Sequence, residues 1–560
     1  MPYNPQNPII VQSDKTILLE THSERFEEAR DALSGFAELV KSPEHIHTYR
    51  ISPLSLWNAA ALGWDPDEVR DTLEEFSKFD LPQNVLADIE EYMGRYGRLR
   101  LVREDDELFL ETDDPVLMTE ILANRKVLPY LDGPASGGRV RVNPEERGTL
   151  KHVLITIGFP VEDLAGYTTG EPLDVELRDT TVAGRSFGLR PYQVESVESF
   201  YAGGSERGGS GVVVLPCGAG KTVVGIGTLS RVKQHTLILT TNVTALRQWR
   251  QEILDKTDLH PDDVGEYSGD RKEIRPVTIT TYQILTYRRS KTDDFAHFHL
   301  FNSANWGLII YDEVHLLPAP VFRAVANLQS RRRLGLTATL VREDGKEEEV
   351  FSLIGPKKYD VPWRVLEKQG FVAEATCFEI RVPFVEDDLR IEYAVADQRR
   401  KYRIAATNPA KLLVVQRLAE QHRNDNVLII GQYLDQLGDI AKLLKAPIIT
   451  GETPQHERDR LFADFKSGRE RRMVVSKVAN FAVDLPDANV AIQVSGTFGS
   501  RQEEAQRLGR VLRPKDNGEN TACFYTLVTQ DSTEQEFSTK RQLFLTEQGY
   551  RYEIQNADLG

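Results

Sequence analysis

Short apolar runs alternate with amphipathic helical patterns throughout the part of the chain that follows Leu189. Each run is bounded by turn residues, and apolar positions at helical spacing follow it. The runs are VVVLP at 212–216, HTLILTT at 235–241, VTITT at 277–281, WGLIIYDE at 306–313, RLGLTAT at 333–339, NVLIIGQ at 426–432, RRMVVS at 471–476, VAIQVSG at 490–496 and CFYTLV at 523–528. This alternation predicts parallel sheets with crossover helices, and the number of strands is enough for two α/β domains.

The pattern before Leu189 is mixed. SERFEEARDALSGFAEL at 23–39 starts with a Ser at the N-cap position and predicts a helix. DPDEVRDTLEEFSKF at 65–79 opens on a cap residue followed by proline and predicts another helix. RLRLVREDDELFLET at 98–112 alternates apolar and polar residues around a charged turn, which predicts a β-hairpin. The Gly/Pro/Ser-rich stretch DGPASGGR from Asp132 indicates a domain boundary nearby.

Composition is that of a globular protein and sets limits on its partners. The 560 residues exceed what one hydrophobic core organises, so roughly three to four domains are expected. The net charge of −16 argues against a protein that coats nucleic acid by bulk electrostatics, although a local basic channel stays possible. Three cysteines without a C-x-x-C pair suggest neither a disulfide framework nor a clustered metal site. With no export signal and no apolar run of membrane-spanning length, we expect a cytoplasmic protein with no membrane partner.

A glycine-rich turn after the first apolar run has the form of a phosphate-binding loop. VVVLPCGAGKTVV at 212–224 departs from G-x-x-x-x-G-K-[ST] in Leu215, which would close the strand, where packing is needed rather than phosphate contact. Backbone N–H groups near the glycines would approach the phosphates, Lys221 would reach the β- and γ-phosphates, and Thr222 would ligand Mg²⁺. The residues predicted to line the ATP site are Pro216, Cys217, Gly218, Ala219, Gly220, Lys221 and Thr222. The alternative is a glycine turn that caps a helix beside a solvated lysine.

An acidic pair ends a later apolar run, in WGLIIYDEVH. Asp312 would hold the Mg²⁺ shell, and Glu313 would orient or deprotonate the attacking water. Alone, such a pair is often a solvated turn. It points to ATP hydrolysis because a phosphate loop precedes it.

Two further segments supply candidates for linking hydrolysis to another event. GLTATL places Thr337 and Thr339 at a strand end, where they are candidates for coupling. In EEAQRLGRVLRP, Gln506, Arg510 and Arg513 share one helix face, from which the arginines could reach a γ-phosphate across a cleft. The alternative for that segment is a basic solvated face.

Together these segments resemble helicase superfamily 2, whose two RecA-like domains close on ATP and grip nucleic acid. LRPYQ looks like the superfamily's adenine-reading element, TTNVTALRQWR and TITTYQ resemble its strand-contacting elements, and KVANFAVDLPDANVAIQVS resembles an element of its second domain. The resemblance assigns Arg190, Gln193 and Asp484 to ATP binding, and Thr241, Arg247 and Thr281 to strand contact.

Within the superfamily, the chain resembles the XPB helicases of DNA repair and transcription initiation. LPCGAGKT, DEVH, LTATLVREDGK and the tail STKRQLFLTEQGYRYEI look like that family's forms, whereas Ala482 stands where a glycine is usual. Arg342, Glu343 and Asp344 match the family's R-E-D motif, which is implicated in strand opening. PFVEDDLRIEYAVADQRRKYR resembles its thumb-like insertion, which would offer Arg399, Arg400, Lys401 and Arg403 to DNA phosphates. The alternative is an exposed helix end.

We therefore expect an α/β fold with two RecA-like parallel-sheet domains, preceded by mixed α/β N-terminal domains. The expected divisions are 1–124, 125–185, 186–365 and 366–560, with the thumb-like insertion at about 383–408. By position, 125–185 would correspond to the family's damage-recognition domain.

The resemblance implies an ATP- and Mg²⁺-dependent 3′–5′ DNA helicase or translocase of the compact bacterial or archaeal form. Its substrates would be forks or single-strand/duplex junctions, and its protein partners would include a nuclease or other repair proteins. Three alternatives remain open: a duplex translocase, an RNA helicase with the same ATPase core, and a non-motor scaffold switched by ATP. Retention of Glu313, Arg510 and Arg513 argues against the scaffold, which does not need turnover.

Overall fold

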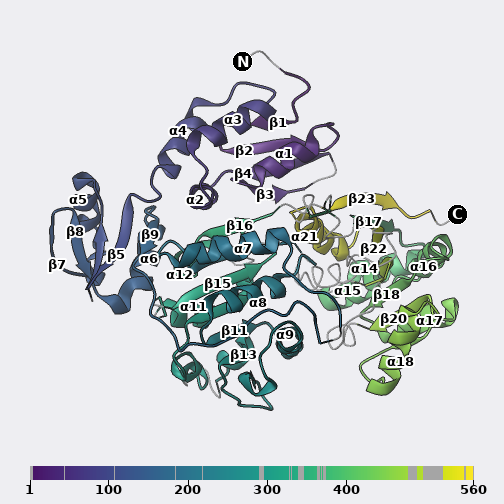
Figure 1. Cartoon of the computed structure of the whole chain (residues 1–560). Coiled ribbons are helices and arrows are strands. Elements are labelled where there is room, and N and C mark those ends of the chain that lie inside the picture. The colour runs from purple at the N-terminus through teal and green to yellow at the C-terminus, as the bar shows by residue number, and fades with distance from the viewer. Residues whose placement is uncertain are drawn as a thin grey trace. The chain divides into compact units, whose positions relative to one another are not determined.

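The chain forms two compact units in the computed structural model shown in Figure 1. Unit 1 holds residues 1–39, 45–215 and 220–361, and unit 2 holds 362–560 with the short segments 40–44 and 216–219. The structure describes residues 4–42, 45–105, 107–182, 184–216, 218–288, 295–326, 328–329, 331–338, 346–361, 366–367, 369, 374–476, 488–495, 521–547 and 550–558.

Unit 1 opens with a four-stranded sheet in the order β1-β2-β4-β3. Its strands are β1 (Ile9–Val11), β2 (Thr16–Glu20), β3 (Glu38–Lys41) and β4 (Ile46–Arg50), and the helices of this region are α1 (Phe26–Leu33), α2 (Pro53–Ala61), α3 (Pro66–Phe76) and α4 (Gln83–Met93). The predicted cap of α3 is confirmed, because the Asp65 side chain accepts the Glu68 N–H.

The helix predicted over 23–39 is wrong at both ends. Arg25 takes the N-cap position without a side-chain hydrogen bond, and α1 ends at Leu33. Gly35 follows in a turn packed so closely on the Trp64 ring that a Cβ there would lie 2.8 Å from it. Residues 38–41 then form a strand, because pairing within the sheet outweighs the local helical spacing.

A five-stranded sheet follows in the order β7-β8-β6-β5-β9. Its strands are β5 (Leu99–Glu104), β6 (Glu107–Glu111), β7 (Leu131–Ser136), β8 (Arg139–Val142) and β9 (Val161–Leu164), with helices α5 (Pro115–Ala123) and α6 (Arg147–Thr156). The predicted hairpin at 98–112 is confirmed as the antiparallel pair β5–β6. The Gly/Pro/Ser-rich stretch from Asp132 forms most of β7 and the turn into β8, so this sheet takes strands from both sides of residue 125.

The third sheet of unit 1 is parallel, with the strand order β12-β13-β11-β14-β15-β10-β16. Its strands are β10 (Ser210–Val214), β11 (Thr236–Thr240), β12 (Val264–Tyr267), β13 (Val277–Thr281), β14 (Leu308–Asp312), β15 (Arg332–Thr337) and β16 (Lys357–Asp360). Its helices are α7 (Pro191–Tyr201), α8 (Lys221–Val232), α9 (Val243–Lys256), α10 (Tyr282–Leu285), α11 (Ala319–Ala326) and α12 (Glu347–Leu353). Residues on both faces of this sheet are buried, as is usual for a parallel sheet that crossover helices cover.

Unit 2 is built on a second parallel sheet, in the order β19-β20-β18-β21-β22-β17-β23. Its strands are β17 (Glu374–Val382), β18 (Val427–Gly431), β19 (Ile448–Ile449), β20 (Arg472–Ser476), β21 (Val490–Gln493), β22 (Thr521–Thr529) and β23 (Arg551–Asn556). Its helices are α14 (Asp387–Val395), α15 (Gln398–Ala406), α16 (Ala410–Gln421), α17 (Leu434–Leu444), α18 (Gln455–Lys466) and α21 (Thr533–Glu547). The predicted fold class, with two parallel-sheet domains, is confirmed. In the described part of the chain, we find no helix with the length and hydrophobicity to cross a membrane.

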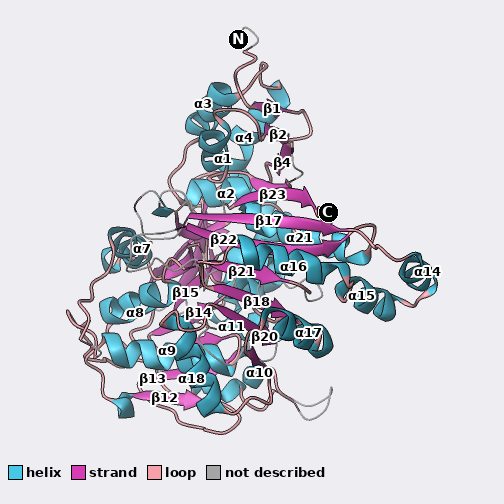
Figure 2. Cartoon of the chain, turned by 90° about the vertical axis from the view of Figure 1, so that its right-hand side faces the viewer, coloured by secondary structure: helices cyan, strands magenta, loops and turns pink. Residues whose placement is uncertain are grey.

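The helices α14 and α15 form a pair beyond one end of the unit 2 strands (Figure 2). They follow β17 directly, and the Asp397 side chain caps α15 by accepting the Arg400 N–H at 2.9 Å. This pair occupies the segment in which the thumb-like insertion was expected.

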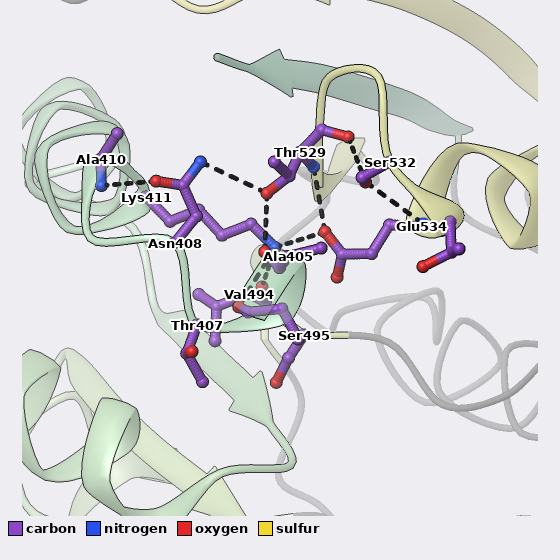
Figure 3. A network of polar contacts seen from close by, with 12 residues as sticks. Ala405, Thr407, Asn408, Ala410, Lys411, Val494, Ser495, Thr529, Ser532 and Glu534 are labelled. Carbon is purple, nitrogen blue, oxygen red and sulfur yellow. Dashed lines mark hydrogen bonds and ion pairs between the residues drawn. The ribbon is translucent and has the colours of Figure 1, made fainter. Parts of the chain in front are cut away.

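A buried polar network holds the end of α15 against the sheet of unit 2 (Figure 3). Lys411 in the first turn of α16 is fully buried, and its Nζ donates to Ala406 O, Val494 O and Glu534 Oε2 at 3.2, 3.0 and 2.8 Å. The same Glu534 oxygen accepts the Thr529 N–H at 2.9 Å. One ion pair therefore ties the helical pair to the carboxyl ends of β21 and β22.

We predict that Lys411→Met destabilises the protein by about 3–5 kcal/mol, because it leaves the Glu534 carboxylate buried without its cation. Urea denaturation followed by circular dichroism measures the change. Adding Glu534→Gln should recover part of the loss, since it removes the orphaned charge. The control is Lys442→Met, whose partner Asp439 lies 3.7 Å away at the surface, and its unfolding free energy should stay close to wild type. Equal destabilisation by both single variants would contradict the role assigned to the buried pair.

Candidate functional site

The predicted strand and helix flanking the phosphate loop are confirmed. Strand β10 is followed by Leu215, which is fully buried and donates its N–H to Thr337 O at 3.0 Å. Leu215 thus continues the sheet, as expected for a position that replaces a glycine without facing a phosphate. Gly218 and Gly220 both have φ of +82°, a region that favours glycine, and α8 begins at Lys221.

The predicted adenine-reading element lies against this loop. A Cβ at Gly220 would come within 2.6 Å of Gln193 Nε2, so the side-chain amide of Gln193 touches the loop backbone. Gln193 is buried, and its Oε1 accepts the Arg190 N–H at 3.0 Å. The Arg190 guanidinium donates to Tyr192 Oη at 3.3 Å. The structure thus brings Arg190 and Gln193 to the helix that carries Lys221.

Asp312 and Glu313 stand at the carboxyl end of β14, near Lys221 at the start of α8. Lys221 Nζ lies 3.6 Å from Glu313 Oε1. Glu313 has φ of +50°, an uncommon backbone conformation for a residue with a side chain and one that concentrates at active sites. Burial, together with the adjacent Glu313 charge, raises the pKa of Asp312 to about 6. Two neighbouring carboxylates therefore share one lysine.

This donor set fits Mg²⁺. Carboxylate and hydroxyl oxygens are the ligands that this ion prefers, and the pair carries more negative charge than Lys221 neutralises. Asp312 and Thr222 would hold the ion, as the sequence predicted, because Thr222 lies in the first turn of α8.

A histidine that sequence reasoning left without a role connects two strand ends. His315 Nδ1 lies 2.7 Å from Thr337 Oγ1, and the same nitrogen lies 3.6 Å from Glu313 Oε2. The side chain of His315 thus lies between Glu313 and Thr337, a predicted coupling residue. His315 stood in the quoted DEVH segment, but no spacing rule distinguished it from a core histidine.

The predicted strand-contacting residues of unit 1 differ in exposure. Arg247 on α9 is exposed, and its guanidinium lies 3.9 Å from Glu266 Oε1. Thr241 is partly buried. Thr281 is buried, and its hydroxyl accepts the Ile284 N–H at the start of α10. Arg247 also lines a hollow of about 650 Å³ with Arg250 and Arg271, together with the acidic Glu252, Asp255 and Glu266.

The basic residues predicted for the thumb-like insertion lie on α15. Arg399, Arg400 and Arg403 are exposed, whereas Lys401 is partly buried with its ammonium 5.6 Å from the Tyr393 ring centroid. Arg400 pairs with Glu392 at 2.8 Å, and Arg403 pairs with Asp435 at 3.0 Å. A phosphate group would therefore compete with a carboxylate at two of these arginines.

The remaining predicted site residues fall outside the described part of the chain. They are Cys217, Thr339, Arg342, Glu343, Asp344, Asp484, Gln506, Arg510 and Arg513.

Comparison with known protein families finds matches in three segments of the chain, two of them to helicase families. Residues 186–342 match the family described as type III restriction enzyme, res subunit, and residues 366–559 match the ERCC3/RAD25/XPB C-terminal helicase family. Residues 9–131 match the helicase conserved C-terminal domain. Two parallel sheets, the first with a phosphate loop and an Asp-Glu pair at its strand ends, define a member of helicase superfamily 2.

Full-length relatives narrow the class. The chain is 54% identical over 553 residues to the DNA 3′-5′ helicase XPB of Kineococcus radiotolerans, covering 98% of this chain and 97% of that protein. It is 52% identical over 552 residues to the DNA 3′-5′ helicase XPB of Mycobacterium tuberculosis, covering 98% of each. A relative in Encephalitozoon cuniculi, a general transcription and DNA repair factor IIH helicase/translocase subunit XPB, is 36% identical over 98% of this chain and 82% of its own length. The chain belongs to the XPB family of DNA 3′–5′ helicases, which confirms the predicted recognition and enzyme class.

We predict that Gly220→Ala abolishes most nucleotide binding. The new Cβ would lie 2.6 Å from Gln193 Nε2, and φ of +82° strains a residue with a side chain by roughly 1–3 kcal/mol. Titration with a fluorescent ATP analogue measures the loss. Gly269→Ala is the matched control, because nothing lies within 4 Å of a Cβ built there, and it should bind as wild type does. Unchanged affinity in Gly220→Ala would remove the loop from the nucleotide site.

Proposed function

We propose that this chain hydrolyses ATP at the ends of β10 and β14 and uses the energy to move along and open DNA with 3′–5′ polarity. One observation carries the proposal: Lys221, at the start of α8, lies 3.6 Å from Glu313 at the end of β14. The lysine proposed to bind phosphate and the carboxylate proposed to activate water therefore lie close enough to act on the same phosphate group. The names of the full-length relatives support DNA as the substrate.

In the proposed ATP site, each group has one task. The loop backbone from Pro216 to Gly220, with Lys221, binds the phosphates, and Arg190 and Gln193 hold the adenine. Glu313 orients the attacking water and accepts its proton. Bound Mg²⁺, held by Thr222 and Asp312, would neutralise charge on the β- and γ-phosphates. Cys217 belongs to the same loop, Gln506 would approach the site from the helix face it shares with Arg510 and Arg513, and the family resemblance adds Asp484.

We propose that His315 links hydrolysis to movement. It contacts Thr337 at 2.7 Å and lies 3.6 Å from Glu313, so displacement of the β15 end changes the surroundings of the water-activating group. Thr337 and Thr339 are the coupling residues in this proposal.

DNA contacts are assigned to three groups of residues. Thr241, Arg247 and Thr281 would contact one strand in the first parallel-sheet domain, and Arg342, Glu343 and Asp344 would act at the junction where strands separate. Arg399, Arg400, Lys401 and Arg403 would contact phosphates from α15. A fork or single-strand/duplex junction is the substrate that all three groups together would fit.

The proposed division of labour follows the expected domains, with ATP bound in 186–365 and the thumb-like insertion in 366–560. A cytoplasmic location fits this proposal, and a nuclease or another repair protein is the partner class we propose. The eukaryotic relative is named as a subunit of a transcription and DNA repair factor, which supports work within a larger assembly.

The function is tested by measuring ATP hydrolysis with single-stranded DNA, duplex DNA, forks and RNA at several stated salt concentrations. We expect stimulation by forks or single strands and unwinding of 3′-tailed duplexes. Stimulation by duplex DNA without unwinding would favour a translocase, stimulation by RNA alone an RNA helicase, and a flat response a non-motor scaffold. The salt dependence counts the phosphates contacted, because each releases counterions.

We predict that Lys221→Ala and Glu313→Gln separate ATP binding from hydrolysis. Lys221→Ala should weaken nucleotide affinity and abolish turnover, because the phosphate cation is lost. Glu313→Gln should keep ATP bound but lower kcat by on the order of 10² to 10⁴, because only the water-activating group changes. Equilibrium binding and steady-state ATPase assays measure both effects. Equal loss of affinity in the two variants would contradict these roles.

Arg510→Ala and Arg513→Ala should retain ATP and DNA affinity but lose DNA-stimulated hydrolysis by on the order of 10³ to 10⁵, as expected for arginine fingers that stabilise transition-state charge. Single-turnover hydrolysis with saturating DNA measures the loss. Full stimulated turnover in either variant would reassign that residue to a solvated helix face.

A further inference from the structure

A buried tryptophan on α9 holds the metal-site carboxylate. Trp249 is 1% exposed, and its Nε1–H donates to Asp312 Oδ2 at 2.9 Å. The same ring packs on α8, because a Cβ added to Gly225 would lie 2.4 Å from Trp249 Cη2. One indole therefore touches both the helix that begins with Lys221 and the carboxylate at the end of β14.

A tyrosine on α10 holds the backbone of the same residue. Tyr282 is buried, and its hydroxyl donates to Asp312 O at 2.9 Å. Tyr282 is the first residue of α10, directly after Thr281, whose own hydroxyl caps that helix. A side chain of α9 therefore hydrogen-bonds the Asp312 carboxylate, and a side chain of α10 hydrogen-bonds its backbone carbonyl.

These two helices also carry the residues proposed to meet DNA. Arg247 precedes Trp249 by two positions, so the two side chains leave α9 in different directions: Arg247 is exposed and Trp249 is buried. Thr281 and Tyr282 are neighbours at the start of α10. A helix moves as a rigid element. A force that DNA exerts on Arg247 would therefore reach Asp312 through Trp249, and a force on the start of α10 would reach it through Tyr282.

We propose that Trp249 and Tyr282 are positioning residues. They orient the Asp312 carboxylate, and this orientation changes when DNA binds on α9 and α10. The inference rests on the proposed DNA contacts of Thr241, Arg247 and Thr281. The indole N–H occupies one carboxylate oxygen and fixes the plane of the group, and the tyrosine fixes the end of the strand that bears it. Without these two donors, Asp312 loses its hydrogen bonds to the helices proposed to contact DNA.

The variants Trp249→Phe and Tyr282→Phe remove each donor and keep a ring in place. Trp306→Phe is the matched control for the indole, because Trp306 is equally buried and its Nε1–H donates to Leu300 O at 2.9 Å. Tyr311→Phe is the control for the hydroxyl, because the buried Tyr311 hydroxyl has no hydrogen-bond partner among the described residues.

Two readouts separate positioning from loss of structure. We expect DNA-stimulated kcat to fall about 10-fold in Trp249→Phe and basal turnover to fall by a smaller factor, so that the ratio of stimulated to basal turnover drops, because one hydrogen bond to a charged acceptor is lost. The Kd for single-stranded DNA is measured with a non-hydrolysable ATP analogue, in Mg²⁺ and in EDTA. Coupling between two binding equilibria is reciprocal, so in Trp249→Phe the nucleotide-dependent change in DNA affinity and the DNA-dependent change in nucleotide affinity should both shrink in Mg²⁺, by the same factor.

Tyr282→Phe should show the same pattern with a smaller change, and both controls should keep wild-type coupling. Wild-type stimulation and coupling in both test variants would overturn this inference alone. Coupling lost equally in Trp306→Phe would reduce Trp249 to a core residue and also overturn it. A wild-type protein that DNA does not stimulate would overturn the proposed function, and this inference with it.

Discussion

Two adjacent carboxylates at the buried end of β14 are the constraint on which unit 1 depends. Like charges in a poorly solvated place cost free energy, and the raised pKa of Asp312 expresses that cost. The surrounding contacts reduce it: Lys221 lies near Glu313, and the Trp249 N–H bonds Asp312. These contacts offset part of the repulsion in the folded protein. The negative charge that remains favours the binding of a further cation.

The strand order of the first parallel sheet brings Lys221 to these two carboxylates. Strand β14 lies between β11 and β15, with β10 next to β15, so the phosphate loop and the acidic pair reach one edge although nearly a hundred residues separate them. Unit 2 meets a related problem differently. Lys411 is fully buried, and its charge is satisfied by Glu534 and two carbonyl oxygens, so this pair fixes a helix end where the pair in unit 1 leaves charge unneutralised.

Sequence predicts the parallel sheets and the phosphate site because their signals are local. The continuous apolar run before LPCGAGKT and the helix after it form within a few residues, and Gly220 has the backbone that its position demands. Local sequence patterns do not predict contacts between residues that are far apart in the chain. The helix expected to reach Leu39 stops where Gly35 packs on Trp64, and Trp249 looks like an ordinary core residue until sheet order brings Asp312 to its N–H.

The arginines proposed to contact DNA belong to a chain with a net charge of −16, and carboxylates lie close to several of them. Arg400 and Arg403 on α15 each pair with a carboxylate, and Arg247 lies near Glu266. A phosphate that binds such an arginine displaces a protein carboxylate, so part of the attraction is offset by the pair that is lost. If these arginines contact DNA as proposed, partly compensated contacts suit a motor, because each phosphate contact would be made and released in every cycle of ATP hydrolysis.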